Sequence, residues 1–376
     1  MKKCIIIPDS FKGTMSSIEI CKIIKDKVKM FYPACETIAI PVADGGEGTA
    51  DCFIQALPAD KITIEVTGPY NEPLLCYYAR HNSTAIVEMA QSAGLPLVEH
   101  RMNPGITTTF GTGLMIKHAV ENGCTDIIIG LGGSCTNDAG TGAAAALGVK
   151  FYDEDGNLFV PNGVTLCRIS KIDVSDARKF LKDCTVTAMC DIDNPMHGSN
   201  GAAYVYGPQK GADEEMVKEL DRNLKALSRK IVTELGVDVS EIPGAGAAGA
   251  MGAGIVAFLE GKLKPGIQTI LDLVHFDDIL DGADLVFTGE GRIDSQSLRG
   301  KAVIGIARRA VRKGVPVIAV VGATGEGAEK AYSMGVSSIF SINRAAVAFE
   351  EARHHSAENL AATIESLMRF SKIYDN

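Results

Sequence analysis

A glycine-rich segment that also carries hydroxyl, amide and carboxylate side chains has the composition of a binding loop. Residues 130–142 read GLGGSCTNDAGTG, directly after the apolar run 127–129 and directly before the alanine-rich stretch 143–147. This order predicts a buried strand, a glycine loop and a helix. Glycine lets the backbone approach a ligand closely, and free N–H groups at a helix start attract anions. The polar side chains of the loop are Ser134, Thr136, Asn137 and Asp138. They predict a phosphate or carboxylate site with a metal ion or proton acceptor nearby.

Two aspartates follow a second apolar run, 186–189. Asp191 and Asp193 stand two positions apart in the sequence CDIDNP, so in an extended segment they face the same side. Paired carboxylates suit Mg²⁺ or a shared proton. The alternative is a solvated turn before Pro195.

Three more polar segments follow predicted strands. They are residues 9–13, residues 43–49 with Asp44 and Glu47, and residues 288–301. Ligands bind at the carboxyl ends of strands in open parallel sheets. Placing charges beside a buried strand end costs free energy unless they bind each other or a ligand. Lys301 is expected at a helix start, where its positive charge is unfavourable to the helix dipole unless an anion is bound. Helix caps and tight turns are the alternative explanation.

Two further glycine-rich segments are less specific. Residues 244–249 read GAGAAG, which fits the dinucleotide motif G-x-G-x-x-G, but no strand is predicted before them. We interpret them as a helix start that packs closely or contacts phosphates, with an NAD site as the alternative. Lys210 lies between glycines in residues 207–212 and indicates little alone. The sequence has no Walker loop, no protein-kinase signature and no hydrolase elbow.

Composition restricts the class of protein. The chain has 376 residues, a net charge of −9 and 46% hydrophobic residues. Its length predicts about two domains, and its negative charge argues against non-specific binding to nucleic acid. The 10 cysteines show no zinc-type spacing, so we expect reduced thiols. Without a signal sequence or an apolar run of membrane-spanning length, we predict a soluble cytoplasmic protein with no membrane partner.

The order of the predicted elements indicates a split α/β architecture. Strands at 4–7, 37–42, 284–288, 315–321 and 337–342 alternate with helices at 16–30, 49–57, 301–313 and 328–334. Such strand–loop–helix units predict a parallel sheet. Between them lie antiparallel strands at 62–66, 75–79 and 84–90, and helices at 108–122 and 214–235. We therefore predict two α/β domains: a split parallel-sheet domain made of residues 1–61 and 283–376, and a mixed domain inserted at 62–282.

Taken together, these motifs resemble the bacterial class I glycerate kinase family. The matching stretches are DSFKGT (9–14), VADGGEGT (42–49), GLGGSCTNDAGTG (130–142), CDIDNP (190–195), GPQKGA (207–212), PGAGAAGAMG (243–252) and FTGEGRIDSQSLRGK (287–301). They run in order over essentially the whole chain. The resemblance implies phosphorylation of D-glycerate by ATP and Mg²⁺ to 2-phosphoglycerate, in the catabolism of carbohydrate acids. It also implies a split Rossmann- or flavodoxin-like domain with an inserted α/β domain, and a site in the cleft between them.

The resemblance carries expected roles for individual residues. Lys12 and Lys301 are expected near the transferred group or the glycerate carboxylate, and Arg292 is expected to form a fork to that carboxylate. Asp191 is the predicted general base and Asp193 or Asp138 the Mg²⁺ ligand, although these roles are exchangeable. The remaining predicted substrate-binding residues are Asp9, Ser10, Asp44, Glu47 and Glu290. The predicted nucleotide-binding residues are Gly132, Gly133, Ser134, Thr136, Asn137, Gly244, Gly246 and Gly249.

Other functions stay open on the sequence alone. They are a glycerate 3-kinase, a nucleotide-dependent oxidoreductase that uses residues 244–249, and a non-catalytic sensor of a hydroxy acid. The oxidoreductase would bind NAD(P)H, whereas clustered carboxylates would be superfluous in a sensor. The sequence is also compatible with a homo-oligomer.

Overall fold

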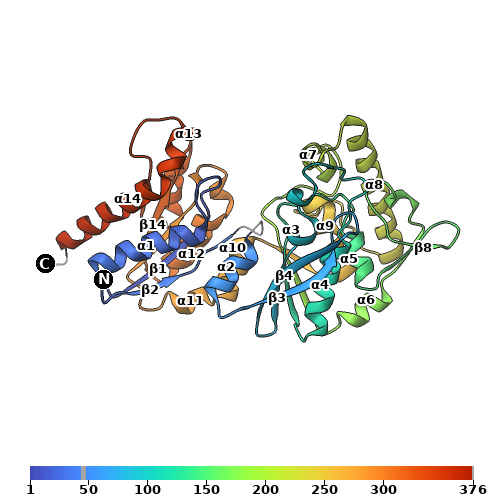
Figure 1. Ribbon diagram of the computed structural model, residues 1–376, viewed down its shortest axis with the longest axis horizontal. Helices are drawn as coiled ribbons and strands as arrows, with labels where there is room; N and C mark the ends of the chain where they lie inside the picture. The colour runs from blue at the N-terminus through green and yellow to red at the C-terminus, as the bar shows by residue number, and fades with distance from the viewer. Residues whose placement is uncertain (44–47, 375–376) are drawn as a thin grey trace. The chain divides into compact units, whose positions relative to one another are not determined.

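The computed structural model describes residues 1–43 and 48–374, so the predicted ligands Asp44 and Glu47 lie outside the described residues. The described chain divides into two compact units (Figure 1). Unit 1 comprises residues 1–43, 51–58 and 265–374, and unit 2 comprises residues 48–50 and 59–264. The division by contacts therefore assigns residues 265–282 to unit 1, whereas the boundaries drawn from sequence place them in the insertion.

Unit 1 is built on a five-stranded parallel sheet. Its strands are β1 (Lys3–Pro8), β2 (Glu36–Ala39), β12 (Leu285–Gly289), β14 (Val317–Val321) and β16 (Ser338–Ser341). Their order across the sheet is β16-β14-β12-β1-β2. Counted within the unit, this is the 2-1-3-4-5 order of flavodoxin-like sheets, and the order reverses between β1 and β12. The predicted parallel sheet is confirmed.

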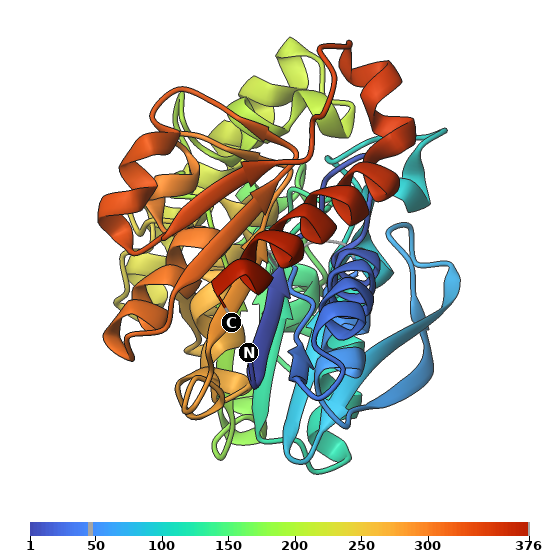
Figure 2. The ribbon, with the colours of Figure 1, turned by 90° about the vertical axis from the view of Figure 1, so that its left-hand side faces the viewer.

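Helices cover both faces of this sheet. Helices α1 (Ser17–Phe31, blue) and α14 (Ser356–Ser371, red) pack on one face, where they share a core with Cys4 and Ile6 (Figure 2). The hydroxyls of Tyr32 and Ser371 join the two helices at 2.8 Å. Because strand side chains alternate, Ile5 and Ile7 face the opposite side, where α12 (Ala302–Arg312) packs on β12 and β14.

The other elements of unit 1 are short. They are α2 (Thr49–Ala56, of which 51–56 belong to this unit), α10 (Gly266–Leu273), α11 (Phe276–Ile279), α13 (Phe349–Ala352), the strand pair β13 (Arg292–Ile293) and β15 (Ala323–Thr324), and four 3₁₀ segments, Ser297–Arg299, Ala328–Met334, Arg353–His355 and Lys372–Tyr374. The helical segment predicted at 328–334 is confirmed, and it is a 3₁₀ helix. Gly327 and Gly335 bound this segment, both with positive φ, and leave only seven residues between two left-handed positions.

Unit 2 contains a six-stranded mixed sheet. Its strands are β3 (Asp60–Thr67), β4 (Pro73–His81), β5 (Thr84–Glu88), β6 (Asp126–Gly130), β10 (Thr185–Met189) and β11 (Lys262–Lys264). They are arranged in the order β11-β10-β6-β5-β4-β3. The predicted antiparallel pairing of the first three strands is confirmed, and β5 also pairs in parallel with β6.

The helices of unit 2 enclose a core with large apolar side chains. They are α3 (Ala90–Ala93), α4 (Phe110–Glu121), α5 (Thr141–Ala146), α6 (Ser175–Phe180), α7 (Ala202–Tyr206), α8 (Glu214–Leu235) and α9 (Ala247–Leu259), with 3₁₀ segments at Leu95–Val98, Leu166–Arg168 and Pro208–Lys210. Phe151 and Phe258 pack edge to face with their ring centroids 5.4 Å apart. No helix in the described part of the chain combines the length and apolarity needed to span a membrane.

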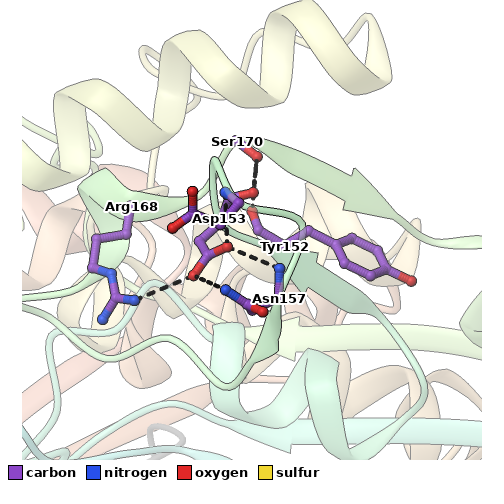
Figure 3. Close-up of polar contacts among 6 residues, drawn as sticks. Tyr152, Asp153, Asn157, Arg168 and Ser170 are labelled. Carbon is purple, nitrogen blue, oxygen red and sulfur yellow. Dashed lines mark hydrogen bonds and ion pairs between the residues drawn. The ribbon is translucent and has the colours of Figure 1, made fainter.

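A small antiparallel sheet that the sequence did not predict is held by one aspartate. Its strands are β7 (Lys150–Tyr152), β8 (Leu158–Phe159) and β9 (Lys171–Asp173). The Asp153 carboxylate accepts the N–H groups of Asp155 at 3.1 Å and Asn157 at 2.9 Å, and pairs with Arg168 at 3.4 Å (Figure 3). These contacts, the Asn157 N–H first, lower the pKa of Asp153 and fix the β7–β8 turn.

Helix α9 meets the glycine loop backbone to backbone. Its residues 248–250 have positive φ, and the Ala139 N–H donates to the Gly249 carbonyl at 3.0 Å. A Cβ on Gly249 would lie 2.0 Å from the Thr136 carbonyl oxygen, and one on Gly254 would lie 2.1 Å from that of Ala139. Glycine is required here because no side chain fits between the two backbones.

This contact predicts that Gly249→Ala destabilises unit 2 beyond the cost of its left-handed backbone. The matched control is Gly236→Ala, because Gly236 has a φ of +72° at the end of α8 and no atom within 4 Å of its Cβ position. We expect the control to lose about 1 to 2 kcal/mol. We expect Gly249→Ala to lose about 3 kcal/mol or more, because the added methyl group also overlaps the loop. Urea denaturation measures both, and equal losses would contradict the close contact.

Candidate active site

Three loops of unit 2 start side by side at one edge of its sheet. Glu88, Gly130 and Met189 end strands β5, β6 and β10, and they are aligned in register across these parallel strands. The segments that follow the three strands therefore begin together. Glu88 is fully buried and accepts the N–H groups of Gly48 at 3.1 Å and Ala50 at 3.4 Å.

The carboxylate of Asp138 holds the glycine loop that follows β6. Its Oδ2 accepts the Thr109 N–H and hydroxyl, both at 2.8 Å, and the Gly142 N–H at 3.3 Å, while Oδ1 accepts the Gly140 N–H at 3.1 Å. The pKa of Asp138 is raised, because the effect of burial exceeds that of these four hydrogen bonds, which lower it. We predicted Asp138 as a metal ligand. A fully buried carboxylate with four donors already bound to it favours a structural role instead.

The predicted nucleotide-binding residues of this loop divide into two groups. Gly132 and Gly133 are accessible, whereas Ser134, Thr136 and Asn137 are buried just behind them. Thr136 Oγ1 and both polar atoms of the Asn137 amide are buried without a hydrogen-bond partner. Such unpartnered groups cost about 1 to 3 kcal/mol each. A polar ligand that bonds to them would offset this cost, and a phosphate oxygen can accept from the Thr136 hydroxyl and the Asn137 amide nitrogen.

A buried lysine contacts the same loop. The ammonium of Lys210 donates to Ser134 Oγ at 2.8 Å and to the Thr136 carbonyl at 2.7 Å. Burial lowers its pKa to about 8, while the neighbouring Cys135 and Asp138 raise it. Lys210 was not among the predicted site residues, because one lysine between glycines is not a specific signal in the sequence.

The glycines at 244–249 pack against other loops. A Cβ on Gly244 would lie 2.6 Å from the Cys190 sulfur, and one on Gly246 would lie 2.3 Å from the Pro195 carbonyl oxygen. Gly249 likewise packs against the Thr136 carbonyl. At all three glycines, neighbouring protein atoms leave no room for a side chain. This geometry favours close packing, one of the two interpretations of the segment.

Asp191 and Asp193 lie on the exposed side of the segment after β10. Both aspartates are exposed, and Ile192 between them is partly buried against the core. This alternation agrees with an extended segment whose two carboxylates share a side. They are accessible to a ligand, as a general base or a metal ligand must be.

The second group of predicted residues lies in unit 1, where the strand order reverses. Pro8 and Gly289 are paired at the ends of β1 and β12, and the Asp9 N–H donates to the Gly289 carbonyl at 2.8 Å. Asp9 and Glu290 thus follow two adjacent strand ends. Helix α1 is capped by a capping box that Ser16 and Glu19 form, so Asp9 and Ser10 are not needed as its cap.

Glu290 is a buried carboxylate beside other charges. It is 7% exposed, and its Oε1 is buried without a hydrogen-bond partner. Burial raises its pKa to about 7, with Asp9 adding to the rise and the Ser297 hydroxyl and Lys301 opposing it. A carboxyl with this pKa changes its charge near neutral pH, which is typical of functional sites.

The three predicted cations of unit 1 are all exposed. Arg292 lies 3.4 Å from the Asp294 carboxylate, and Lys301 occupies the N-cap position of α12 without a side-chain cap bond. The backbone of Lys12 lies next to Gly291, where a Cβ would be 3.4 Å from the Lys12 nitrogen. Unit 1 therefore gathers Asp9, Ser10, Lys12, Glu290, Arg292 and Lys301 around the ends of β1 and β12.

The candidate metal ligands form no dense cluster. Within residues 1–43 and 48–374, no three His, Cys, Asp or Glu side chains lie close enough to hold a metal ion. Mg²⁺ that binds with a nucleotide needs only one or two carboxylates, because phosphate oxygens and water complete its coordination. The exposed pair Asp191 and Asp193 fits that requirement.

Comparison with known proteins identifies relatives over nearly the full length of the chain. The model of the glycerate kinase family matches residues 4–372. A glycerate kinase of Bacillus cereus is 44% identical over 99% of this chain and 98% of its own length. The glycerate 2-kinase of Escherichia coli is 40% identical over 98% of this chain and 99% of its own length.

A solved structure shows the same fold. It is a crystal structure from Salmonella typhimurium LT2, assigned as glycerate kinase 2, with a TM-score of 0.88 and 38% sequence identity. The match covers 99% of this chain and 98% of that one. This chain belongs to the glycerate kinase family and is a kinase.

Proposed function

We propose that this kinase transfers the terminal phosphoryl group of ATP to the C2 hydroxyl of D-glycerate. The observation that carries the proposal is the loop 132–137, which starts at a strand end and holds buried hydroxyl and amide groups without protein partners. The names of the relatives supply the acceptor: several are glycerate kinases, and one is a glycerate 2-kinase.

The nucleotide phosphates are assigned to the glycine loop of unit 2. Gly132 and Gly133 offer accessible backbone, and Ser134 offers a hydroxyl directly behind them. We give the glycines at 244, 246 and 249 the role of packing this loop and the 190–195 segment into place. Mg²⁺, when bound, neutralises charge on the phosphate oxygens, and Asp193 is its proposed ligand.

Glycerate is assigned to the ends of β1 and β12 in unit 1, where the strand order reverses. Arg292 pairs with its carboxylate through two N–H groups, and Glu290 accepts a hydrogen from one of its hydroxyls. Lys12 and Lys301 supply positive charge for the carboxylate or the transferred group. Phosphoryl transfer depends mainly on positioning and charge neutralisation, and these four residues provide both.

Asp191 is the proposed general base. An exposed carboxylate can accept the proton of the attacking glycerate hydroxyl as the new O–P bond forms. Because nucleotide and acceptor are assigned to different units, the reaction requires that both units reach the same phosphoryl group.

The oxidoreductase alternative has little support. The segment before α9 is a turn, so a strand that would deliver a dinucleotide motif is missing from the described residues there. The glycines of the motif also pack directly against other protein atoms.

We propose a cytoplasmic location for the reaction. All ten cysteines lie among the described residues, their thiols are free, and seven of them are buried. Free thiols are typical of a reducing compartment.

The product of the reaction tests the proposal directly. With D-glycerate, ATP and Mg²⁺, we expect ³¹P and ¹³C NMR to show a phosphate ester on C2. A phosphate on C3 would retain the kinase and correct its regiochemistry. No phosphorylated glycerate at all would contradict the acceptor.

Asp191→Asn should reduce kcat at least about 100-fold while ATP still binds, because the variant keeps the shape of the side chain and loses the proton acceptor. Asp183→Asn, a change of another exposed aspartate in unit 2, is the control. Kinetics and calorimetric ATP titration measure the two effects. Near-normal turnover of Asp191→Asn would refute the assignment, and a selective loss in Asp193→Asn would exchange the two roles.

Glu290→Gln should stabilise the protein at alkaline pH and weaken glycerate binding. The pKa of Glu290 rises from 4.5 to about 7 on folding, so folding takes up a proton between these values, and stability falls as pH rises through that range. Gln stays neutral at every pH. We expect similar stability of both proteins near pH 5, and at pH 8 a gain of about 2 to 3 kcal/mol for the variant.

Urea denaturation at the two pH values checks this, with Glu329→Gln, at an exposed site of unit 1, as the control. The KM for glycerate should rise about 10-fold in the Glu290 variant, since a hydrogen-bond acceptor for the substrate is lost. A variant that gains no stability at pH 8 would show that the carboxylate is not held in a desolvated site.

A further inference from the structure

The side chain of Lys210 is enclosed by the protein in a way that no other described cation is. It is 2% exposed, and among the side chains that the structure describes no other Lys or Arg is buried. It closes the 3₁₀ turn Pro208–Lys210, where its N–H donates to the Gly207 carbonyl at 2.9 Å. Gly211 follows with a φ of +93°, and a Cβ there would lie 2.6 Å from that of Met102. The position of Lys210 is therefore fixed on both sides.

The charge of Lys210 is not neutralised by a nearby carboxylate. No Asp or Glu of the described chain lies within ion-pair distance of its ammonium, and its titratable neighbours are Cys135 and Asp138. Burial raises the pKa of the Cys135 thiol to about 12, so the thiol is neutral. The Asp138 carboxylate is already bound by four donors. With a pKa of about 8, Lys210 is mostly charged at neutral pH, and a buried charge without a counter-ion is costly.

The bond to Ser134 determines where the serine hydrogen can point. An ammonium group has donors and no acceptor, so Ser134 Oγ must accept from Lys210 and keep its own hydrogen for another partner. Ser134 Oγ has no acceptor among the described residues. Thr136 Oγ1 and the Asn137 amide are unpartnered as well. Ser134 thus keeps a hydroxyl donor beside a buried positive charge, and this pair complements a phosphate group.

We propose that Lys210 is a positioning residue for the phosphoryl donor. Its ammonium holds Ser134 Oγ and the Thr136 carbonyl so that the Ser134 hydroxyl donates to a phosphate oxygen, and its charge stabilises that phosphate through the loop. This inference rests on the proposed function and adds a residue to it. It predicts an effect on polyphosphate binding and none on glycerate binding.

The test compares Lys210→Met with the wild-type protein. Met keeps the length of the side chain and removes the charge and both hydrogen bonds. By calorimetric titration with ATP and with inorganic tripolyphosphate, we expect Kd to rise about 10- to 100-fold for both. The KM for ATP should rise in parallel, whereas the KM for glycerate should stay within about twofold. Lys218→Met, at an exposed lysine of α8, is the control and should bind tripolyphosphate as the wild type does.

A second variant separates the hydroxyl from the charge. Ser134→Ala retains Lys210 and should show the same selective loss for polyphosphate. In the double variant the losses should be far from additive, because Lys210 acts through Ser134. If Lys210→Met does not fold, Ser134→Ala decides the question alone.

The outcomes distinguish this inference from the function on which it rests. Wild-type binding of tripolyphosphate with unchanged Kd in Lys210→Met or in Ser134→Ala overturns the role of Lys210 and leaves the kinase intact. Additive losses, or an equal rise in the KM for glycerate, overturn it as well. A wild-type protein that neither binds ATP nor phosphorylates glycerate overturns the proposed function itself.

Discussion

The four hydrogen bonds to the Asp138 carboxylate are the constraint on which the rest of the unit 2 site depends. They join the start of α4, through Thr109, to the start of α5, through Gly140 and Gly142. The loop after β6 runs from Gly130 to this anchored carboxylate. That path brings the Thr136 carbonyl to Lys210 and to Gly249, and it buries Asn137. These four donors favour a structural role for Asp138 over the predicted role as a metal ligand.

The two units place polar residues according to the same rule. In unit 1, β1 and β12 flank the reversal of strand order, and Asp9 and Glu290 follow their ends. In unit 2, the register of β5, β6 and β10 aligns the segments that start after Glu88, Gly130 and Met189. Parallel strands deliver their carboxyl ends to one edge, so loops distant in sequence become neighbours. The long excursion of the chain between β2 and β12 leaves the 2-1-3-4-5 order of the first sheet undisturbed.

The regular elements were predictable from the sequence because their signals are local. Apolar runs such as Ile127–Ile129 and periodic helices such as α8 depend on neighbouring residues alone. Segments that take their conformation from distant contacts were not predicted: in the β7–β9 sheet, strand β7 pairs with β9 about twenty positions later, and Arg168 and Ser170 contact Asp153. The helix at 328–334 was predicted, and its two flanking glycines, which are local in the sequence, limit it to a 3₁₀ segment.

The site followed the same division. Polar residues at strand ends were found because their position beside a buried strand is visible in the sequence. The environment of Lys210 was not predicted because its burial and its bond to Ser134 are properties of the fold. The hydrogen bonds of Asp138 were not predicted either, because Thr109 lies 29 positions earlier in the chain. The glycines at 244, 246 and 249 matched a ligand-binding motif, yet the positions where their side chains would be are filled by other protein atoms.

The contact between α9 and the glycine loop has a further consequence, for the entropy of ligand binding. Left-handed residues lie on both sides of it, Ala139 and Gly140 in the loop and residues 248–250 in the helix. The backbones of α9 and of the glycine loop are packed so closely that neither can adopt another conformation while the other is in place. The loop is therefore ordered as the chain folds. The conformational entropy of these residues is thus lost at folding, and little remains to be lost when an anion arrives. In the proposed function, the glycine loop is a preorganised receptor whose conformation derives from the packing of α9 against it.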